Sequence, residues 1–157
     1  MSVERTSGRE LVVMRTINAP PRIVFEAWIN AELLKRWWVP KSFALELLSC
    51  ELDVRVGGAY RLVFRHPADP EPMAFHGRYL EVRPPSRLVW TNEEAGNAGQ
   101  VTTVTFEERG EQTQLVVHDL YSSKEALDEA VSSGSISWND DTFDQLDELL
   151  VSATPLK

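Results

Sequence analysis

Histidine is the residue type in this chain best suited to metal binding and to proton transfer near neutral pH. Its three copies, His66, His76 and His118, come from three separate segments. None has the i, i+4 or His-Glu-x-x-His spacing that places two ligands on one helix face. The sequence therefore predicts no metal site. His118-Asp119, at the end of a strand-like run, could provide a polar contact in a pocket, as could Tyr121 and His76. Such residues are more often hydrogen-bonded and partly exposed without any role in a site.

Two further groups could carry chemistry, an acidic pair and a lone thiol. The pair Glu93-Glu94 precedes the polar loop 95–99, which favours a solvated turn over an acid–base pair. Cys50 lies in the strand-like run 43–54, where a buried and unreactive thiol is favoured over a nucleophile. No Gly-x-Ser-x-Gly elbow, phosphate loop or dinucleotide fingerprint is present. We therefore predict no catalytic residue and no cofactor.

Three arginines lie in strand-like segments, Arg61, Arg65 and Arg78. A guanidinium that faced the interior would indicate an anion-binding pocket. In a bent sheet, the alternation of side chains does not decide which face these arginines occupy.

Five tryptophans in 157 residues could line a ligand pocket. Each indole buries something like 150–250 Å² of surface, so a core role is the first interpretation for Trp28, Trp37 and Trp38. For Trp90 and Trp138, core and pocket wall are about equally favoured.

The composition excludes several classes of partner. Sixteen Lys and Arg against 24 Asp and Glu give a net charge of −8, which repels nucleic acid. No apolar run approaches the roughly 20 residues that span a bilayer. Residues 1–10 are polar and lack the apolar core of a secretory signal, which predicts a cytoplasmic protein. A single cysteine cannot form an internal disulfide.

The chain length fits one domain. We expect a flexible N-terminus over residues 1–10, one domain over 11–152 and a short tail over 153–157. The sequence is compatible with a monomer or a homodimer.

The elements that position these groups are predicted from local patterns. Residues 11–17 are rich in β-branched side chains and indicate a first strand. Pro20 suits the first turn of a helix, and Asn30 is a suitable cap for a second short helix that ends before Pro40. The Gly57-Gly58 pair indicates a tight bend, with a positive φ at Gly58.

Closely spaced turn signals divide the middle of the chain into strands of an antiparallel meander. A short helix is indicated around 124–131, and an amphipathic helix over 137–151 ends the domain. The predicted strands of the meander are 43–54, 59–65, 74–83, 87–93, 100–108 and 112–119.

Several motifs together resemble a known superfamily, the START-like or SRPBCC proteins. Within it, the pattern is most similar to the branch named after the activator of the heat-shock protein 90 ATPase, over about residues 11–150. The motifs are Trp37-Trp38-Val39-Pro40, the run 54–61 around Gly57-Gly58, Ala19-Pro20-Pro21 before a helix, the strand 101–106, and Trp138 at the start of the last helix.

This resemblance implies an α+β helix-grip fold. In it, a curved antiparallel sheet of six to seven strands wraps around a long C-terminal helix, with two short helices after the first strand. Such folds commonly keep a cavity between sheet and helix. The residues expected to line it are Trp38, Phe64, Phe75, Trp90, Phe106, His118, Tyr121, Trp138 and Phe143.

The resemblance favours binding of a small apolar or amphipathic molecule in that cavity. A chaperone-interacting module with a role in stress response is the alternative that the branch name implies. The eukaryotic activators carry a separate N-terminal domain for their main chaperone contact, whereas only about ten polar residues precede the first predicted strand. A third alternative is a cyclase- or hydrolase-like enzyme, which would need positioned acid–base groups.

Overall fold

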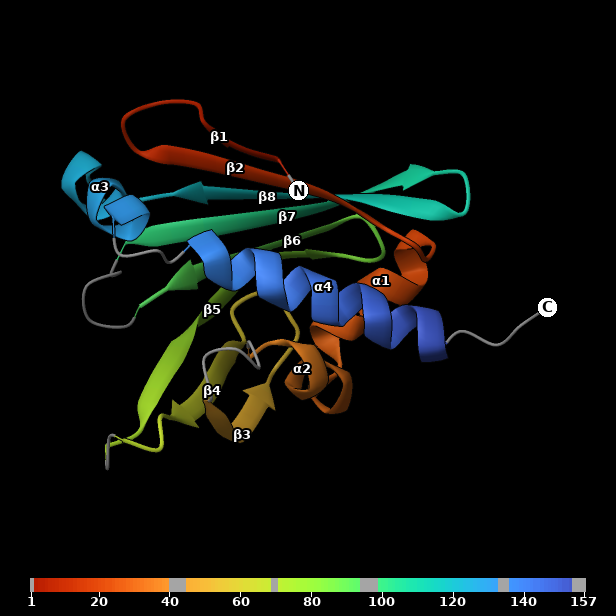
Figure 1. Ribbon diagram of the computed structural model, residues 1–157, viewed down its shortest axis with the longest axis horizontal. Helices are drawn as coiled ribbons and strands as arrows, with labels where there is room; N and C mark the ends of the chain where they lie inside the picture. Colours follow the sequence, from red (N-terminus) through yellow and green to blue (C-terminus); the bar gives the residue numbers. More distant parts are fainter. Residues whose placement is uncertain (1, 40–44, 69–70, 94–98, 133–135, 154–157) are drawn as a thin grey trace.

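The protein is an α+β domain in which helices cover one face of a curved antiparallel sheet (Figure 1). The computed structural model describes residues 2–39, 45–68, 71–93, 99–132 and 136–153, without the side chains of 2, 136–140, 152 and 153. Over these residues no helix is long and apolar enough to cross a membrane.

The described sheet has eight strands in the order β1-β2-β8-β7-β6-β5-β4-β3, all paired antiparallel. The strands are Ser2–Arg5 (β1), Glu10–Ile17 (β2), Glu46–Leu52 (β3), Ala59–Arg65 (β4), Met73–Arg83 (β5), Arg87–Asn92 (β6), Gln100–Arg109 (β7) and Gln112–Leu120 (β8).

Four helices accompany the sheet in the described part of the chain. They are Pro21–Ile29 (α1), Ala31–Trp37 (α2), Lys124–Ser132 (α3) and Ile136–Ala153 (α4). In Figure 1, α4 crosses one face of the sheet, α1 and α2 lie beside its C-terminal half, and α3 lies near its N-terminal end. This arrangement is consistent with the helix-grip fold that the sequence implies.

The predicted strand count of six to seven is wrong, because the structure adds β1 at the sheet edge. β1 lies within residues 1–10, which we expected to be flexible, and pairs with β2 so that Val3 is opposite Val13. Its sequence, Ser-Val-Glu-Arg, is short and lacks an alternating pattern. Its strand conformation therefore comes from pairing with β2, which a local pattern cannot reveal.

The two short helices lie where their local sequence predicts, with a shift of one residue at the start of the first. Pro20, predicted in the first turn, is the N-cap of α1, and Pro21 is the first helical residue, where a missing N–H is no loss. Asn30 caps α2, as predicted: its Oδ1 accepts hydrogen bonds from the backbone N–H groups of Glu32 (2.9 Å) and Leu33 (3.3 Å). Because Asn30 is also the C-terminal cap of α1, one residue connects the two helices.

Helix α4 contacts the rest of the domain through a buried apolar face and through an ion pair on its polar side. Phe143, Leu146 and Leu150 are buried in the core. On its polar side, Asp144 forms an ion pair with Arg15 of β2, at 2.7 Å between carboxylate and guanidinium. The apolar face supplies most of the stabilisation, since exposed ion pairs contribute little.

The bend at Gly57-Gly58 has a different cause from the predicted one. The positive φ, 84°, is at Gly57, so the prediction for Gly58 is wrong. Gly58 is required because a Cβ there would lie 2.0 Å from the backbone oxygen of Asp53. A side chain at this position would therefore force the backbone apart.

Candidate functional site

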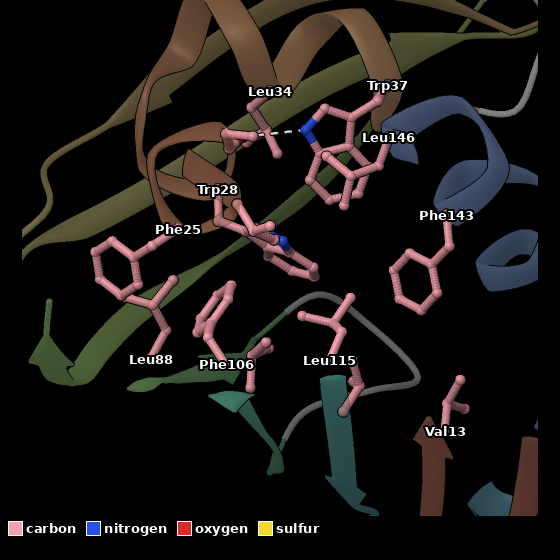
Figure 2. Packing of buried hydrophobic residues seen from close by; sticks show 14 of the residues in the cluster. Val13, Phe25, Trp28, Leu34, Trp37, Leu88, Phe106, Leu115, Phe143 and Leu146 are labelled. Atoms are coloured by element: carbon pink, nitrogen blue, oxygen red, sulfur yellow. Dashed lines mark hydrogen bonds between the residues drawn. The ribbon is translucent and has the colours of Figure 1, made fainter. Parts of the chain in front are cut away.

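An aromatic layer lies between the sheet and the helices, formed by Trp28, Trp38, Trp90, Phe106 and Phe143. Figure 2 shows three of these rings, those of Trp28, Phe106 and Phe143. Trp28 of α1 is at its centre. The centroid of its ring is 5.8 Å from Trp90, 6.0 Å from Trp38 and from Phe106, and 6.2 Å from Phe143. The layer thus brings together rings from α1, β6, β7, α4 and the residue that follows α2.

The indole N–H groups in this region differ in their partners. Trp37, fully buried behind Trp28, donates to the carbonyl of Ala27 at 3.0 Å. Trp28 is only 5% exposed and Trp38 is half-buried, yet the Nε1 atoms of both are buried without an acceptor among the described residues. Two unused donors therefore lie within the aromatic layer.

The layer continues from Trp38 toward the β3–β4 end of the sheet. The Trp38 ring meets Phe75 edge-on at 6.3 Å, and Phe75 stacks on Phe64 at 4.9 Å. Phe64 is buried, whereas Phe75 and Trp38 are half-buried. This arm is therefore the part of the aromatic layer that solvent reaches.

The opposite end of the inner face carries a buried polar network. Asp119 of β8 is buried, and its Oδ1 accepts hydrogen bonds from Thr102 Oγ1 (2.5 Å) and Gln100 Nε2 (3.1 Å). Thr102 accepts in turn from Asn92 Nδ2 at 3.0 Å. Tyr60 of β4 reaches this network from the other side, since its hydroxyl donates to the carbonyl of Thr91 at 2.7 Å and lies 3.4 Å from Asn92 Oδ1.

Burial raises the pKa of two side chains at this end of the inner face, Asp119 and Tyr121. Desolvation raises the pKa of the Asp119 carboxyl, and the hydrogen bonds from Thr102 and Gln100 oppose that rise. Desolvation also raises the pKa of the Tyr121 hydroxyl, with a smaller contribution from the negative charge of Asp119. Tyr121 therefore stays protonated at neutral pH.

Strand register joins the two ends into one surface. Trp90 on β6 is the partner of Thr102 on β7, and Thr102 is the partner of Asp119 on β8. The three side chains lie side by side on the inner face, and Trp90 contacts Trp28. An apolar region with unused donors thus passes directly into a polar region with a carboxylate.

The structure brings most of the predicted site residues to this inner face. Trp38, Trp90, Phe106 and Phe143 belong to the aromatic layer, Phe64 and Phe75 to its exposed arm, and Tyr121 follows Asp119 at the polar end. Trp138 lies in α4, but its side chain is outside the described residues.

His118 does not belong with the other predicted residues. Val117 and Asp119 are buried on the inner face, so the alternation of β8 places His118 on the outer face. There its Nε2 lies 2.8 Å from Glu10 Oε2 of β2. The prediction that His118 lines the interior is therefore corrected.

Sequence reasoning missed Trp28 and Thr102 as site residues, and it named Asp119 only in passing. A signal for Asp119 was available, because Leu115, Val117 and Asp119 follow one another at every second position of a strand. The central place of Trp28 depends on contacts between distant segments, which no local pattern indicates.

The arginines whose face was undecided point outward. Arg61 and Arg78 are exposed and border an open hollow of about 610 Å³, together with Glu51 and Glu93. Arg65 forms an ion pair with a glutamate of β3 at 3.0 Å. The mixture of charges in the hollow does not indicate an anion site.

The lone thiol and the histidines were the remaining groups that could carry chemistry. Cys50 is half-buried, and desolvation raises the pKa of its thiol to about 11, so it is a thiol and not a thiolate at neutral pH. Within the described ranges, no group of three or more His, Cys, Asp or Glu side chains is arranged to hold a metal ion.

A family model matches most of this chain. The family model described as "Activator of Hsp90 ATPase homolog 1-like protein" matches residues 18–151. A comparison with curated proteins gave no match.

Solved structures resemble the whole chain. A protein from Nitrosomonas europaea is 24% identical, with a TM-score of 0.84 over 94% of this chain and 97% of its own. One from Rhodobacter sphaeroides is 21% identical, with a TM-score of 0.88 over 97% and 98%. An AHSA1-like protein from Aeromonas hydrophila is 17% identical, with a TM-score of 0.76 over 94% and 98%. At these identities the likeness shows the fold alone.

Proposed function

We propose that this chain, which belongs to the family of activator of Hsp90 ATPase homolog 1-like proteins, binds a small amphipathic molecule between its sheet and α4. The observation that carries the proposal is the pair of buried indole N–H groups, of Trp28 and Trp38, without an acceptor among the described residues.

Unused buried donors are costly, which is why they indicate a ligand. More than about 90% of buried polar groups in folded proteins have a partner. Leaving one N–H unpaired costs about 1–3 kcal/mol. The two indole rings have centroids only 6.0 Å apart, so the oxygen atoms of one ligand could accept from both. Binding would then form the two hydrogen bonds that folding alone leaves unmade.

The surroundings of the two donors fit an apolar body attached to that acceptor. Trp90, Phe106 and Phe143 present ring faces and edges to Trp28, and these give affinity through burial of apolar surface. Trp38, half-buried, provides the side from which a ligand would reach the layer. The ligand class is therefore a rigid, mostly apolar molecule with a carbonyl or ether oxygen.

Nile red tests this proposal, because it is neutral, aromatic and carries a carbonyl group. We expect saturable enhancement of its emission at one dye per chain, and a rise in melting temperature, since only the folded state binds. No saturable signal from Nile red or from flavone, up to their solubility limits, would overturn the proposal.

A matched pair of variants tests the role of the donors. Trp28→Phe removes an unused N–H and keeps an aromatic ring, so we expect Nile red affinity to fall about tenfold, the equivalent of one hydrogen bond. Trp37→Phe removes an N–H that is already bonded to Ala27, and we expect unchanged affinity in this control. Equal effects in the two variants would contradict the assignment.

The chaperone alternative is separable by a direct assay. The family description names activation of the Hsp90 ATPase, and that activity would require contact with a large protein surface. We expect no stimulation when this chain is added to purified Hsp90 in stoichiometric amounts. A several-fold rise in ATPase rate would rank the chaperone role first.

A further inference from the structure

Gln145 of α4 connects that helix to the segment that carries Trp38. Its Nε2 donates to the backbone carbonyl of Trp37 at 3.1 Å and to that of Val39 at 2.9 Å. The two carbonyls flank Trp38, which is the C-terminal cap of α2. The amide of one side chain therefore holds the backbone on both sides of a single tryptophan.

The C-terminal end of α2 is a place where such hydrogen bonds matter. The last carbonyls of a helix accept no hydrogen bond within the helix, so they need water, a side chain or another segment as partner. Trp37 is the last residue of α2, a helix of seven residues. Helices of this length have little stability of their own, because few hydrogen bonds offset the cost of nucleation. We therefore expect the conformation of the chain around Trp38 to depend on Gln145.

Trp38 joins the interior of the aromatic layer to the arm that solvent reaches. Its ring meets Trp28 edge-on at 6.0 Å and Phe75 edge-on at 6.3 Å. Trp28 is 5% exposed, whereas Trp38 and Phe75 are half-buried. A molecule that approached Trp28 from this arm would therefore displace the Trp38 ring first.

Building on the proposed function, we infer that Gln145 is a positioning residue that holds Trp38 against Trp28 and thereby controls how fast a ligand enters and leaves the aromatic layer. While both hydrogen bonds are made, the backbone of residues 37–39 is fixed. When they break, the end of α2 opens and the Trp38 ring moves away from Trp28. Because Gln145 Nε2 donates to the backbone and not to the ligand, its loss changes the rates of binding more than the affinity.

Hydrogen exchange of the indole N–H groups, followed by NMR, tests the role of Gln145 without any ligand. Gln145→Met keeps the length of the side chain and removes the donor without adding a charge. We expect the Trp38 indole N–H to exchange roughly tenfold faster in this variant, the effect of one lost hydrogen bond on a local opening. The Trp37 indole N–H, bonded to Ala27 in the core, should keep its rate. Trp38→Phe assigns the signal.

Stopped-flow mixing with Nile red tests the consequence for binding. We expect Gln145→Met to raise the association and dissociation rate constants of the dye by roughly tenfold, because both steps pass through the same open state, and to change Kd by less than about threefold. Asp144→Asn is the matched control, since it breaks the ion pair between the neighbouring residue of α4 and Arg15. We expect unchanged dye rates and unchanged Trp38 exchange in this control. Melting curves of both variants establish that they fold.

The two measurements separate this inference from the proposed function. Unchanged exchange at Trp38 in Gln145→Met would overturn the inference, whatever the dye shows. Equal acceleration at Trp38 and Trp37, or an equal effect of Asp144→Asn, would overturn it too, because Gln145 would then only stabilise the helices. If Nile red binds but its rates do not change in Gln145→Met, the inference is wrong and the proposed function stands. If Nile red does not bind the unmodified protein, the proposed function fails, and the exchange rates alone decide whether Gln145 holds Trp38.

Discussion

Trp28 and Trp37 lie in contact, 4.8 Å between ring centroids, yet they represent two different kinds of region. Trp37 is fully buried and its indole N–H is bonded to Ala27. The backbone carbonyl of Trp37 is also bonded, because it accepts from Gln145 of α4 at 3.1 Å. Around Trp28 the packing is equally aromatic, but the N–H is unused.

The difference teaches how to separate core from site in a domain rich in tryptophan. Burial alone does not distinguish the two indoles, since both are almost inaccessible. The hydrogen-bond partners do, because a region that only stabilises the fold satisfies its polar atoms. The first three predictions below test this contrast within the interior, and the last extends it to the outer face.

The largest expected effect is at Trp37. Trp37→Ala removes a fully buried ring and its hydrogen bond, and we expect a loss of about 3–5 kcal/mol in the free energy of unfolding. Urea denaturation followed by circular dichroism measures this loss. A loss below about 1 kcal/mol would mean that the Trp37 region is not a tightly packed core.

The next effect concerns the pH dependence set by Asp119. Its pKa is higher in the folded protein than in the unfolded chain, where it is about 3.9. The folded state therefore binds the proton more tightly, and the stability present below pH 4 is lost as the pH rises toward the folded pKa. We expect the difference in unfolding free energy between the unmodified protein and Asp119→Asn to fall as the pH rises above about 4. Urea titrations at intervals of one pH unit measure it, and a constant difference would contradict burial of the charge.

A smaller effect is expected when Trp28 is changed. Trp28→Phe loses ring contacts but also removes an unpaired N–H, so its unfolding free energy should stay within about 1 kcal/mol of the original. Trp37→Phe should cost at least about 1 kcal/mol more, because it breaks a buried hydrogen bond. Thermal and urea unfolding of the two variants measure which substitution costs more unfolding free energy. A costlier change at Trp28 would break the contrast between the two regions.

The smallest effect is expected on the outer face. The hydrogen bond from His118 is the main cause that lowers the pKa of Glu10 in the folded protein. This pair therefore stabilises the fold above the unfolded pKa of Glu, and that contribution disappears as the pH falls through the folded pKa. Both side chains are partly exposed, so we expect Glu10→Gln to change stability only slightly at pH 7. A melting temperature that differs by many degrees would show that the pair is more important than its exposure indicates.

Local sequence predicted the elements well and the site only in part. Pro20, Asn30 and the alternation of β4 act within a few residues, so they indicated the helix boundaries and the buried face of the strand. β1 was not predicted, because it is specified by its partner strand and not by its own residues. The outward orientation of His118 could have been predicted from the buried Val117 beside it.

The unused donors could not have been predicted from the sequence. Whether an indole N–H finds an acceptor depends on which distant segment packs against it, as with Trp28 and Trp90. The same holds for Asp119, whose two donors, Gln100 and Thr102, both lie on the neighbouring strand β7. Long-range contacts of this kind appear only once the fold is assembled.

The connection of α1 and α2 through Asn30 has a consequence for the order of folding. Trp28 and Trp38 are close in sequence on either side of this cap and in contact, and Thr102 and Asp119 belong to neighbouring strands of one hairpin. Contacts between near neighbours lose less chain entropy when they form than contacts between distant segments. Each half of the site can therefore assemble locally. The meeting of Trp28 with Trp90 is the late, non-local step that makes the two halves a single site.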